Sequence, residues 1–382
     1  MSQYLSHGGI GAFAGSSGIA MADSHIKTTY TESYNLSIER EITRDMVATV
    51  SYVGNVGKHT FAGTDPLGPL AITSSNNPTN TSAFPVGIGL SSGSAEQWIG
   101  ESMYNGLQAK IQQRFANGFS FLGTYTWSHA VDDAGNPGIG GGPPYRNTNL
   151  IPLKYEMTNS NFDTRHRLTF NGLYELPFGK GRKYLANSGV LDYLVGGWSA
   201  SATWTAQTGI PFTVFTGGGN FVAANGIVNG PNAILVGNPF KGGGRVPTAN
   251  LDTSSCPPKV KTRTNWYNPC AFIDPQPGTN IGVDQYLTDL ASAIEYAGGK
   301  SNQIHGPGWE RVNMSGFKNF KTFREQYVQF RADAFNLFNS ESWGQPSETD
   351  LAPSTGLISS PQPFQNNTPD ARFFQLSAKY VF

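Results

Sequence analysis

Ala371–Phe382 reads Ala-Arg-Phe-Phe-Gln-Leu-Ser-Ala-Lys-Tyr-Val-Phe, and its pattern governs how the other segments are interpreted. Every second residue from Phe382 back to Phe374 is apolar or aromatic, whereas the residues between them include Lys379 and Gln375. A period of two is the repeat of a β-strand. The length is close to the ~9–11 residues that a tilted strand needs to cross a membrane. The pattern predicts a transmembrane strand with a lipid face and a lumen face. The alternative is a half-buried strand of a soluble sandwich.

The composition narrows the class of protein. The 382 residues carry 26 Lys+Arg and 26 Asp+Glu, so the net charge indicates no nucleic-acid partner. Charged residues make up 14% of the chain, below the roughly 25% typical of soluble domains. No run approaches the ~18 consecutive apolar residues of a membrane-spanning helix. Aromatic residues reach 12%, which argues against a disordered chain, so the composition favours an all-β protein.

The same alternation recurs eight more times along the chain. The clearest case is 119–128, where aromatic residues oppose serine and threonine, directly after the hairpin signal Asn117-Gly118. The other strands are expected around residues 34–38, 48–52, 107–112, 167–176, 198–207, 312–314 and 328–334. With the last stretch, the sequence predicts about nine long antiparallel strands.

Long and short connections alternate between these strands. Long loops are expected at about 54–101, 130–163, 212–310 and 339–370. Transmembrane barrels carry long loops outside and short turns on the periplasmic side, whereas a soluble sandwich has no reason to place all long connections at one end. We therefore expect a partial outer-membrane β-barrel over 28–382, surrounded by outer-membrane lipid. Residues 1–27 are expected to be a flexible Gly/Ser-rich loop remnant.

Charged strand residues fall mostly on the positions opposite the apolar face. A lipid-facing Lys or Arg at the membrane midplane costs ~2–4 kcal/mol, so these side chains are expected to face the lumen. The lumen-facing candidates are Lys110, Arg167, Glu175, Arg331, Asp333 and Lys379.

Two cysteines, Cys256 and Cys270, lie in a loop region rich in Pro, Asn and Thr. A loop disulfide between them would contribute ~3 kcal/mol in the chain-entropy model and would indicate an oxidising compartment. The alternative is a pair of free thiols. A zinc site would need further ligands at suitable spacing, and no Cys or His pair nearby supplies them.

Two polar clusters raise the question of catalysis. The first joins His129 to Asp132 and Asp133, and a polar rim where a strand leaves the membrane is favoured over a metal or acid-base site. The second is the run Asp163-Thr-Arg-His-Arg167, for which a salt-bridged strand entry formed by Asp163, Arg165, His166 and Arg167 is favoured over catalysis.

Two motifs of common enzymes are missing in the form that catalysis needs. No Gly-x-Ser-x-Gly segment joins a predicted strand to a helix, and the sequence has no complete Gly-x-x-x-x-Gly-Lys-Ser/Thr phosphate loop. We therefore expect neither an enzyme nor a cofactor. Loop aromatics could stack on sugars or peptides or could pack the loops, and both interpretations stay open for Trp266, Tyr267, Trp309 and Trp343.

A series of short motifs from about Thr28 to the end resembles the carboxyl-terminal barrel of Oar-like TonB-dependent receptors, which also carry a carboxypeptidase-regulatory-like domain. The motifs are Tyr34-Asn-Leu-Ser-Ile-Glu-Arg40, Tyr52-Val-Gly-Asn-Val-Gly57, Tyr104-Asn-Gly-Leu-Gln108, Tyr125-Thr-Trp-Ser-His129, Asp163-Thr-Arg-His-Arg167, Gly197-Trp198, Asp333-Ala-Phe-Asn-Leu-Phe-Asn339 and the terminal Phe382.

This resemblance implies a barrel of about twenty-two strands with a plugged lumen. It also implies a large ligand taken up through TonB. The sequence departs from that family because it has neither a plug nor a TonB-contacting segment, and nine strands are too few. We therefore expect a fragment that pairs with the rest of a receptor and reaches TonB only through the missing plug. Tyr380 and Phe382 resemble the signal read by the barrel-assembly machinery, although Ser377 stands where glycine is common.

Three functions follow as hypotheses. The first is the barrel portion of a TonB-dependent transporter in the bacterial outer membrane. The second is a stand-alone small outer-membrane pore, which requires an even number of strands. The third is a secreted or surface-attached all-β binding module of adhesin type, suggested by the Gly/Asn/Thr-rich loops.

Overall fold

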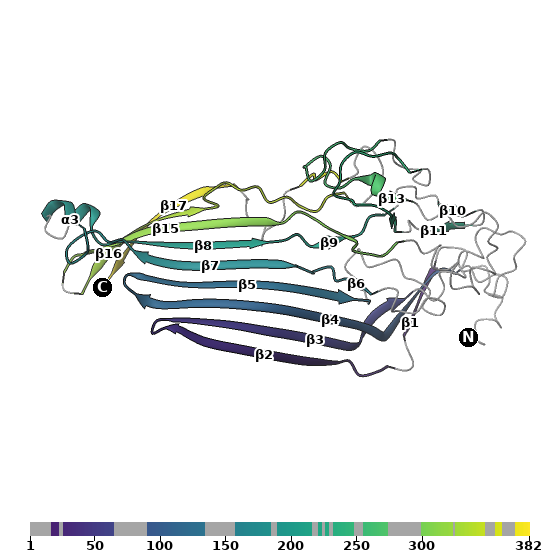
Figure 1. Ribbon diagram of the computed structural model, residues 1–382, viewed down its shortest axis with the longest axis horizontal. Coiled ribbons are helices and arrows are strands. Elements are labelled where there is room, and N and C mark those ends of the chain that lie inside the picture. The colour runs from purple at the N-terminus through teal and green to yellow at the C-terminus, as the bar shows by residue number, and fades with distance from the viewer. Residues whose placement is uncertain are drawn as a thin grey trace, which may run out of the picture.

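Nine long strands form one antiparallel sheet in a computed structural model of the chain (Figure 1). The structure describes residues 17–22, 26–64, 90–133, 157–184, 189–215, 221–223, 226–228, 232–247, 255–273, 299–323, 325–347, 356–360 and 371–382. The nine strands are β2 (Tyr30–Thr43), β3 (Met46–Thr64), β4 (Leu90–Ala116), β5 (Phe119–Asp132), β7 (His166–Glu175), β8 (Trp198–Gln207), β15 (Trp309–Lys321), β16 (Tyr327–Phe335) and β17 (Phe373–Val381). The prediction of an all-β chain with nine long strands is confirmed.

The strand order is β17-β16-β15-β8-β7-β5-β4-β3-β2, so each long strand pairs with the long strands before and after it in the chain. Short connections and the carboxyl terminus lie at one end of the sheet, and the strand ends that lead into the long connections, with the described parts of those connections, lie at the other (Figure 1). Asn117 and Gly118, which join β4 to β5, have φ of 54° and 79°. Positive φ at both central residues is the geometry expected for an Asn-Gly hairpin. The predicted separation of short periplasmic turns from long extracellular loops is confirmed.

Each strand presents one apolar face, and the register carries that face across the sheet. Leu36 pairs with Tyr52, Tyr52 with Leu107 and Leu107 with Trp127. All four side chains are exposed, and 68% of Leu36 is accessible. On the last strand, 82% of Leu376 is accessible as well. A water-soluble sheet buries its apolar face, and a contiguous exposed band of this size marks a surface that faces lipid or a partner. In a transmembrane barrel wall this band is the lipid face.

The buried apolar core lies in the long connection between β8 and β15. Its members are Phe212, Val214, Ala233, Tyr267, Ala271, Phe272 and Ile304. Three short strand pairs belong to this connection: β9 (Pro211–Phe212) with β14 (Ile304–His305), β10 (Phe221–Ala223) with β11 (Gly226–Val228), and β12 (Ile234–Leu235) with β13 (Phe272–Ile273). A single turn of 3-10 helix, η3 (Pro269–Ala271), precedes β13. This part of the predicted loop 212–310 is therefore a small packed unit.

Several strand boundaries differ from the prediction. β3 continues to Thr64 and β4 begins at Leu90, so both ends of the predicted loop 54–101 are strand. These two strands keep pairing beyond the predicted ends, with Thr64 opposite Ala95. β6 (Thr158–Asn159), within the predicted loop 130–163, pairs with β5.

The predicted loop remnant 1–27 and the shorter predicted turns also contain regular structure. β1 (Ser17–Ala22) pairs in parallel with the start of β4. A short helix, α3 (Gly189–Val195), lies in the connection between β7 and β8, at the same end as the tight turns (Figure 1). No helix in the described part of the chain is long and apolar enough to cross a membrane.

Candidate functional site

The predicted lumen-facing residues all lie on the polar face of the sheet. Their register partners on neighbouring strands are mostly polar, because Lys110 pairs with Thr124, Arg167 with Thr126 and Lys379 with Gln329. A single face therefore carries hydroxyls, amides and charges across the sheet.

Two of these six residues contact each other. Arg331 Nε donates to Asp333 Oδ1 at 2.7 Å, and Arg331 Nη2 donates to Ser315 Oγ at 2.9 Å. Glu175 accepts a charged hydrogen bond from Arg182 at the periplasmic end. The contacts among the described residues of this face thus form a dispersed polar lining and not a compact reaction centre.

A buried carboxylate lies at the extracellular rim. Asp163 precedes β7, and only 1% of its side chain is exposed. Its carboxylate accepts hydrogen bonds from Ala130 N at 2.7 Å, Arg165 Nε at 2.7 Å and His305 Nε2 at 3.3 Å. Burial alone raises the pKa of this carboxyl, but the hydrogen bonds from His305 and Ala130 and the Arg165 charge outweigh burial and hold the pKa below its usual value. Asp163 is therefore an ionised centre that joins the end of β5, the entry to β7 and the loop before β15.

Arg165 extends this network to a second layer. Its Nη2 atom donates to His129 Nε2 at 2.9 Å and to Asn159 Oδ1 at 2.8 Å. Asn159 Nδ2 in turn donates to the carbonyl of Asn302 at 2.8 Å, and Asn302 Nδ2 donates to the carbonyl of Asn159 at 2.8 Å. Residues more than 140 positions apart are held together in this way. The structure thus brings part of the first predicted cluster, His129, into the second.

The other members of the two clusters lie elsewhere. Asp133 is buried and accepts a hydrogen bond from Glu101 N at 2.6 Å, and burial raises the pKa of Asp133 to about 6. His166 lies on the apolar face, where its Nδ1 is 2.8 Å from the Tyr125 hydroxyl. Among the described residues no group of three or more His, Cys, Asp or Glu could hold a metal ion.

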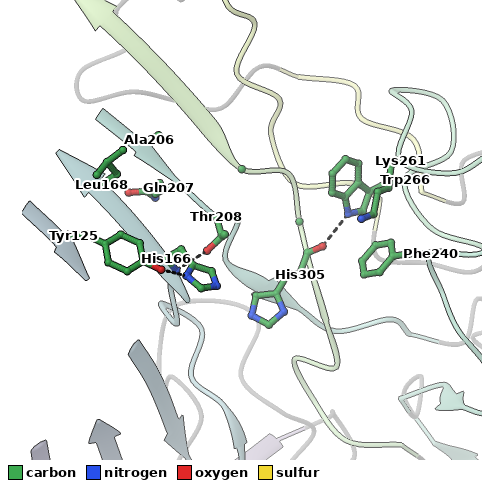
Figure 2. Close-up of a pocket in the computed structure, with 13 residues that line it drawn as sticks. Tyr125, His166, Leu168, Ala206, Gln207, Thr208, Phe240, Lys261, Trp266 and His305 are labelled. Atoms are coloured by element: carbon green, nitrogen blue, oxygen red, sulfur yellow. Dashed lines mark hydrogen bonds between the residues drawn. The ribbon is translucent and has the colours of Figure 1, made fainter. Parts of the chain in front are cut away.

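A cavity of about 480 Å³ lies where the β8–β15 connection meets the sheet (Figure 2). Its sheet side is formed by apolar-face residues, among them Leu168, Ala206 and the Tyr125–His166 pair shown in Figure 2. Its loop side is formed by Phe240, Lys261, Trp266 and His305. The sheet residues that line the cavity thus come mostly from the apolar face, with Gln207 of the polar face beside them.

The aromatic residues singled out in the loops pack against protein. Tyr267 is fully buried, packs on Phe212 and Phe272, and donates its hydroxyl to the carbonyl of Ser347 at 3.2 Å. Trp266 Nε1 donates to the carbonyl of His305 at 2.8 Å. Tyr267 therefore packs the loop, whereas Trp266 contacts the loop and also lines the cavity.

Two further predicted features lie at opposite ends of the sheet. A disulfide joins Cys256 to Cys270 in the β8–β15 connection. At the carboxyl terminus, the Tyr380 hydroxyl donates to Gln326 Oε1 at 2.6 Å, and Phe382 is almost fully exposed. Recognition of these two aromatic residues by the assembly machinery stays a prediction.

Sequence reasoning missed Lys261, Phe240 and His305 as cavity residues. Phe240 and Lys261 stand in irregular segments and His305 ends a two-residue strand, so none of them has a periodicity that connects it to the long strands. The pairing of Asn159 with Asn302 was equally invisible, since nothing in either local sequence specifies a partner so distant in the chain.

An exposed apolar face, an opposite polar face and long connections gathered at one end define a wall of a transmembrane β-barrel. The chain belongs to the outer membrane beta barrel domain family, which matches residues 3–375. The chain is accordingly an outer-membrane protein. No curated protein sequence matches it.

Several solved outer-membrane structures are similar to the chain. BauA, the ferric preacinetobactin receptor of Acinetobacter baumannii, is 9% identical with a TM-score of 0.39, and the match covers 92% of this chain and 29% of that one. The outer membrane transporter YddB of Escherichia coli is 8% identical with a TM-score of 0.44, covering 96% and 34%. The pyoverdine receptor FpvA of Pseudomonas aeruginosa PAO1 is 10% identical with a TM-score of 0.42, covering 95% and 31%. The chain thus spans about a third of the length of each.

Proposed function

We propose that the chain is the carboxyl-terminal barrel portion of a TonB-dependent outer-membrane receptor of Oar-like type. In this proposal residues 28–382 form part of the barrel wall, the polar face lines a lumen that holds a plug, and the long connections meet a large ligand outside the cell. The remainder of the receptor supplies the plug and the missing strands, TonB acts through that plug, and the barrel-assembly machinery inserts the wall. The chain itself carries out no chemical reaction.

The observation that carries this proposal is the open sheet. In the pairing of the described strands, β2 and β17 each lie at an edge with one neighbour. Unpaired backbone groups at such an edge are not tolerated in hydrocarbon, so further strands are required to close the wall.

Direct closure of these nine strands faces a second obstacle. β2 ends at the short turn before β3, and β17 ends at the same end of the sheet, so the two strands run in the same direction (Figure 1). Their union would be parallel in a sheet whose other long-strand pairs are antiparallel. The small-pore hypothesis requires an even number of strands, and the nine long strands of the described residues are an odd number, so this hypothesis is disfavoured.

The extracellular features support a receptor role. Burial of Asp163, the Asn159–Asn302 contacts and the Cys256–Cys270 disulfide hold the outer ends of the wall and the β8–β15 connection in one arrangement. A preorganised surface loses less conformational entropy when a large ligand binds than a loose one does.

The experiment is a denaturing blot of outer membranes from the source bacterium, with an antibody raised against Phe374–Phe382. Denaturation is necessary because this segment is a membrane strand in the folded protein. We expect a band several tens of kilodaltons above the 41.1 kDa of this chain. A single band at 41.1 kDa would overturn the receptor proposal, and ion conductance of that product in planar bilayers would then establish a pore.

A further inference from the structure

The short helix α3 lies against the apolar face of the wall at its periplasmic end. Lys318 of β15 pairs with Phe330 and Trp198, whose side chains belong to that face. The Lys318 ammonium donates to the backbone carbonyl of Tyr193 at 2.5 Å. Because Tyr193 belongs to α3, this contact places the helix outside the lumen, on the side that faces lipid.

Two more contacts hold α3 in this position. The Tyr193 ring centroid lies 5.4 Å from that of Phe320, the next apolar-face residue of β15. Trp198 Nε1 donates to the carbonyl of Leu194 at 3.0 Å. The last turn of α3 is thus joined to both β8 and β15.

The helix shields the Lys318 ammonium from lipid. A lysine on the lipid face of a barrel is costly, and Lys318 is only 5% exposed. Its ammonium lies 4.8 Å from the Phe320 ring centroid and 5.8 Å from that of Tyr193. A carbonyl and two aromatic rings therefore replace lipid around the charge, and the lysine fastens the helix to the wall.

The last three residues of α3 have accessible aromatic or aliphatic side chains. Tyr193 is 64% exposed, Leu194 60% and Val195 42%. A tyrosine and two aliphatic side chains are the composition found where a short helix meets the boundary between headgroups and acyl chains. These side chains lie next to the lipid face of β8 and β15, which Tyr193 and Leu194 contact.

The turn before α3 carries positive charge. Lys180, Arg182 and Lys183 are all exposed, and Arg182 also pairs with Glu175. Basic side chains beside an apolar helix are attracted to anionic headgroups, because apolar burial and Coulomb attraction act at the same depth of the interface.

We propose that α3 and the basic turn Lys180–Lys183 bind the periplasmic leaflet, with Tyr193, Leu194 and Val195 inserted at the headgroup boundary and the lysines against the phosphates of anionic phospholipids. The site lies outside the barrel, so this inference holds whether or not the wall belongs to a transporter.

Depth measurement by spin labelling tests the insertion. Because both native cysteines form the disulfide, Leu194→Cys gives a single labelling site in the full chain assembled in an outer membrane. Leu376→Cys on the lipid face and Asp45→Cys in a tight turn at the same end serve as lipid and water references. We expect the ratio of oxygen to nickel-chelate collisions at position 194 to shift toward that at 376. A ratio equal to that at 45 would overturn the proposal and would leave α3 as a surface for a periplasmic protein.

Lipid composition tests the charge complementarity. The labelled chain is placed in vesicles of phosphatidylcholine alone or mixed with phosphatidylglycerol. We expect deeper immersion of the label in the mixed vesicles and loss of that shift in the Lys180→Gln/Lys183→Gln variant. Lys241→Gln/Lys259→Gln removes the same charge from the extracellular connection and should keep the shift. Equal depth in both kinds of vesicle would overturn the assignment to anionic lipid.

Discussion

Replacing Asp163 by alanine should favour local unfolding of the extracellular rim while the sheet stays folded. The carboxylate is buried and accepts hydrogen bonds from Ala130 N and Arg165 Nε at 2.7 Å each and from His305 Nε2 at 3.3 Å. Alanine leaves the Ala130 N–H without its acceptor and removes the counter-charge of Arg165. The strands below the rim keep all their ladder hydrogen bonds.

The magnitude follows from these three contacts. Breaking a fully buried ion pair costs ~3–5 kcal/mol. The Arg165 side chain is 33% exposed and water can solvate it in the variant, so the loss of the Asp163–Arg165 ion pair is taken to cost less than this range. Leaving a buried donor without an acceptor adds ~1–3 kcal/mol. We therefore expect a loss of about 2–4 kcal/mol in the free energy of local opening. This loss corresponds to roughly a 30- to 700-fold larger open population.

Hydrogen exchange of the Ala130 amide in membrane-embedded protein measures this population. Asp132→Ala, at the end of the same strand, is the control, because Asp132 makes none of these contacts. Exchange at Ala130 should accelerate by the stated factor in Asp163→Ala and stay unchanged in the control. An acceleration below threefold in Asp163→Ala would refute the reasoning.

The same carboxylate sets an acid limit on the rim. The pKa of Asp163 is lower in the folded protein than its ordinary 3.8, so its stabilisation is present above pH 3.8 and is lost as pH falls through the lowered value. Acceleration of exchange at the rim should therefore begin below pH 3.8 in the wild type and be absent from Asp163→Ala.

Three further predictions concern other parts of the chain. Burial raises the pKa of Asp133 to about 6, so the stability that its protonated form contributes is lost as pH rises through about 6. Protease sensitivity of the wild type should therefore increase over this pH range. Asp133→Asn, which keeps an acceptor oxygen and does not titrate, should abolish that increase. Leu376→Arg on the lipid face should lower the free energy of unfolding by ~2–4 kcal/mol and so reduce the yield of folded protein, whereas Gln375→Arg on the polar face should not. Heat-modifiable mobility on a gel measures the folded fraction. Cys270→Ser should cost the β8–β15 connection ~3 kcal/mol, visible as faster proteolysis of that connection with the sheet intact.

The sheet could be predicted from the sequence because the alternation of apolar and polar residues within each strand identifies both of its faces. The alternation in 119–128 and in Ala371–Phe382 needs no knowledge of a partner, and turn residues such as Asn117-Gly118 fix the neighbour. Once hairpins are assigned, the order of strands follows, since consecutive antiparallel strands pair.

The rim and the helix could not be predicted in the same way. Asn302 and His305 meet the entry to β7 only because the β8–β15 connection folds back, and irregular segments carry no period that specifies such a contact. Lys318 stands on the lipid face in violation of the pattern. A charged residue at a lipid-facing position indicates that another part of the chain covers it, and the structure shows that this part is α3.

The most direct measurement is a cysteine scan of β5 in the assembled outer membrane. Single cysteines at 119–128 are treated with a water-soluble thiol reagent that does not enter lipid. A barrel wall predicts reaction at the even positions on the polar face, such as Ser120, Thr124 and Thr126, and protection at Phe121 and Tyr125 on the lipid face. Equal reaction at all positions would contradict the transmembrane wall, because it would mean that both faces of the strand meet water.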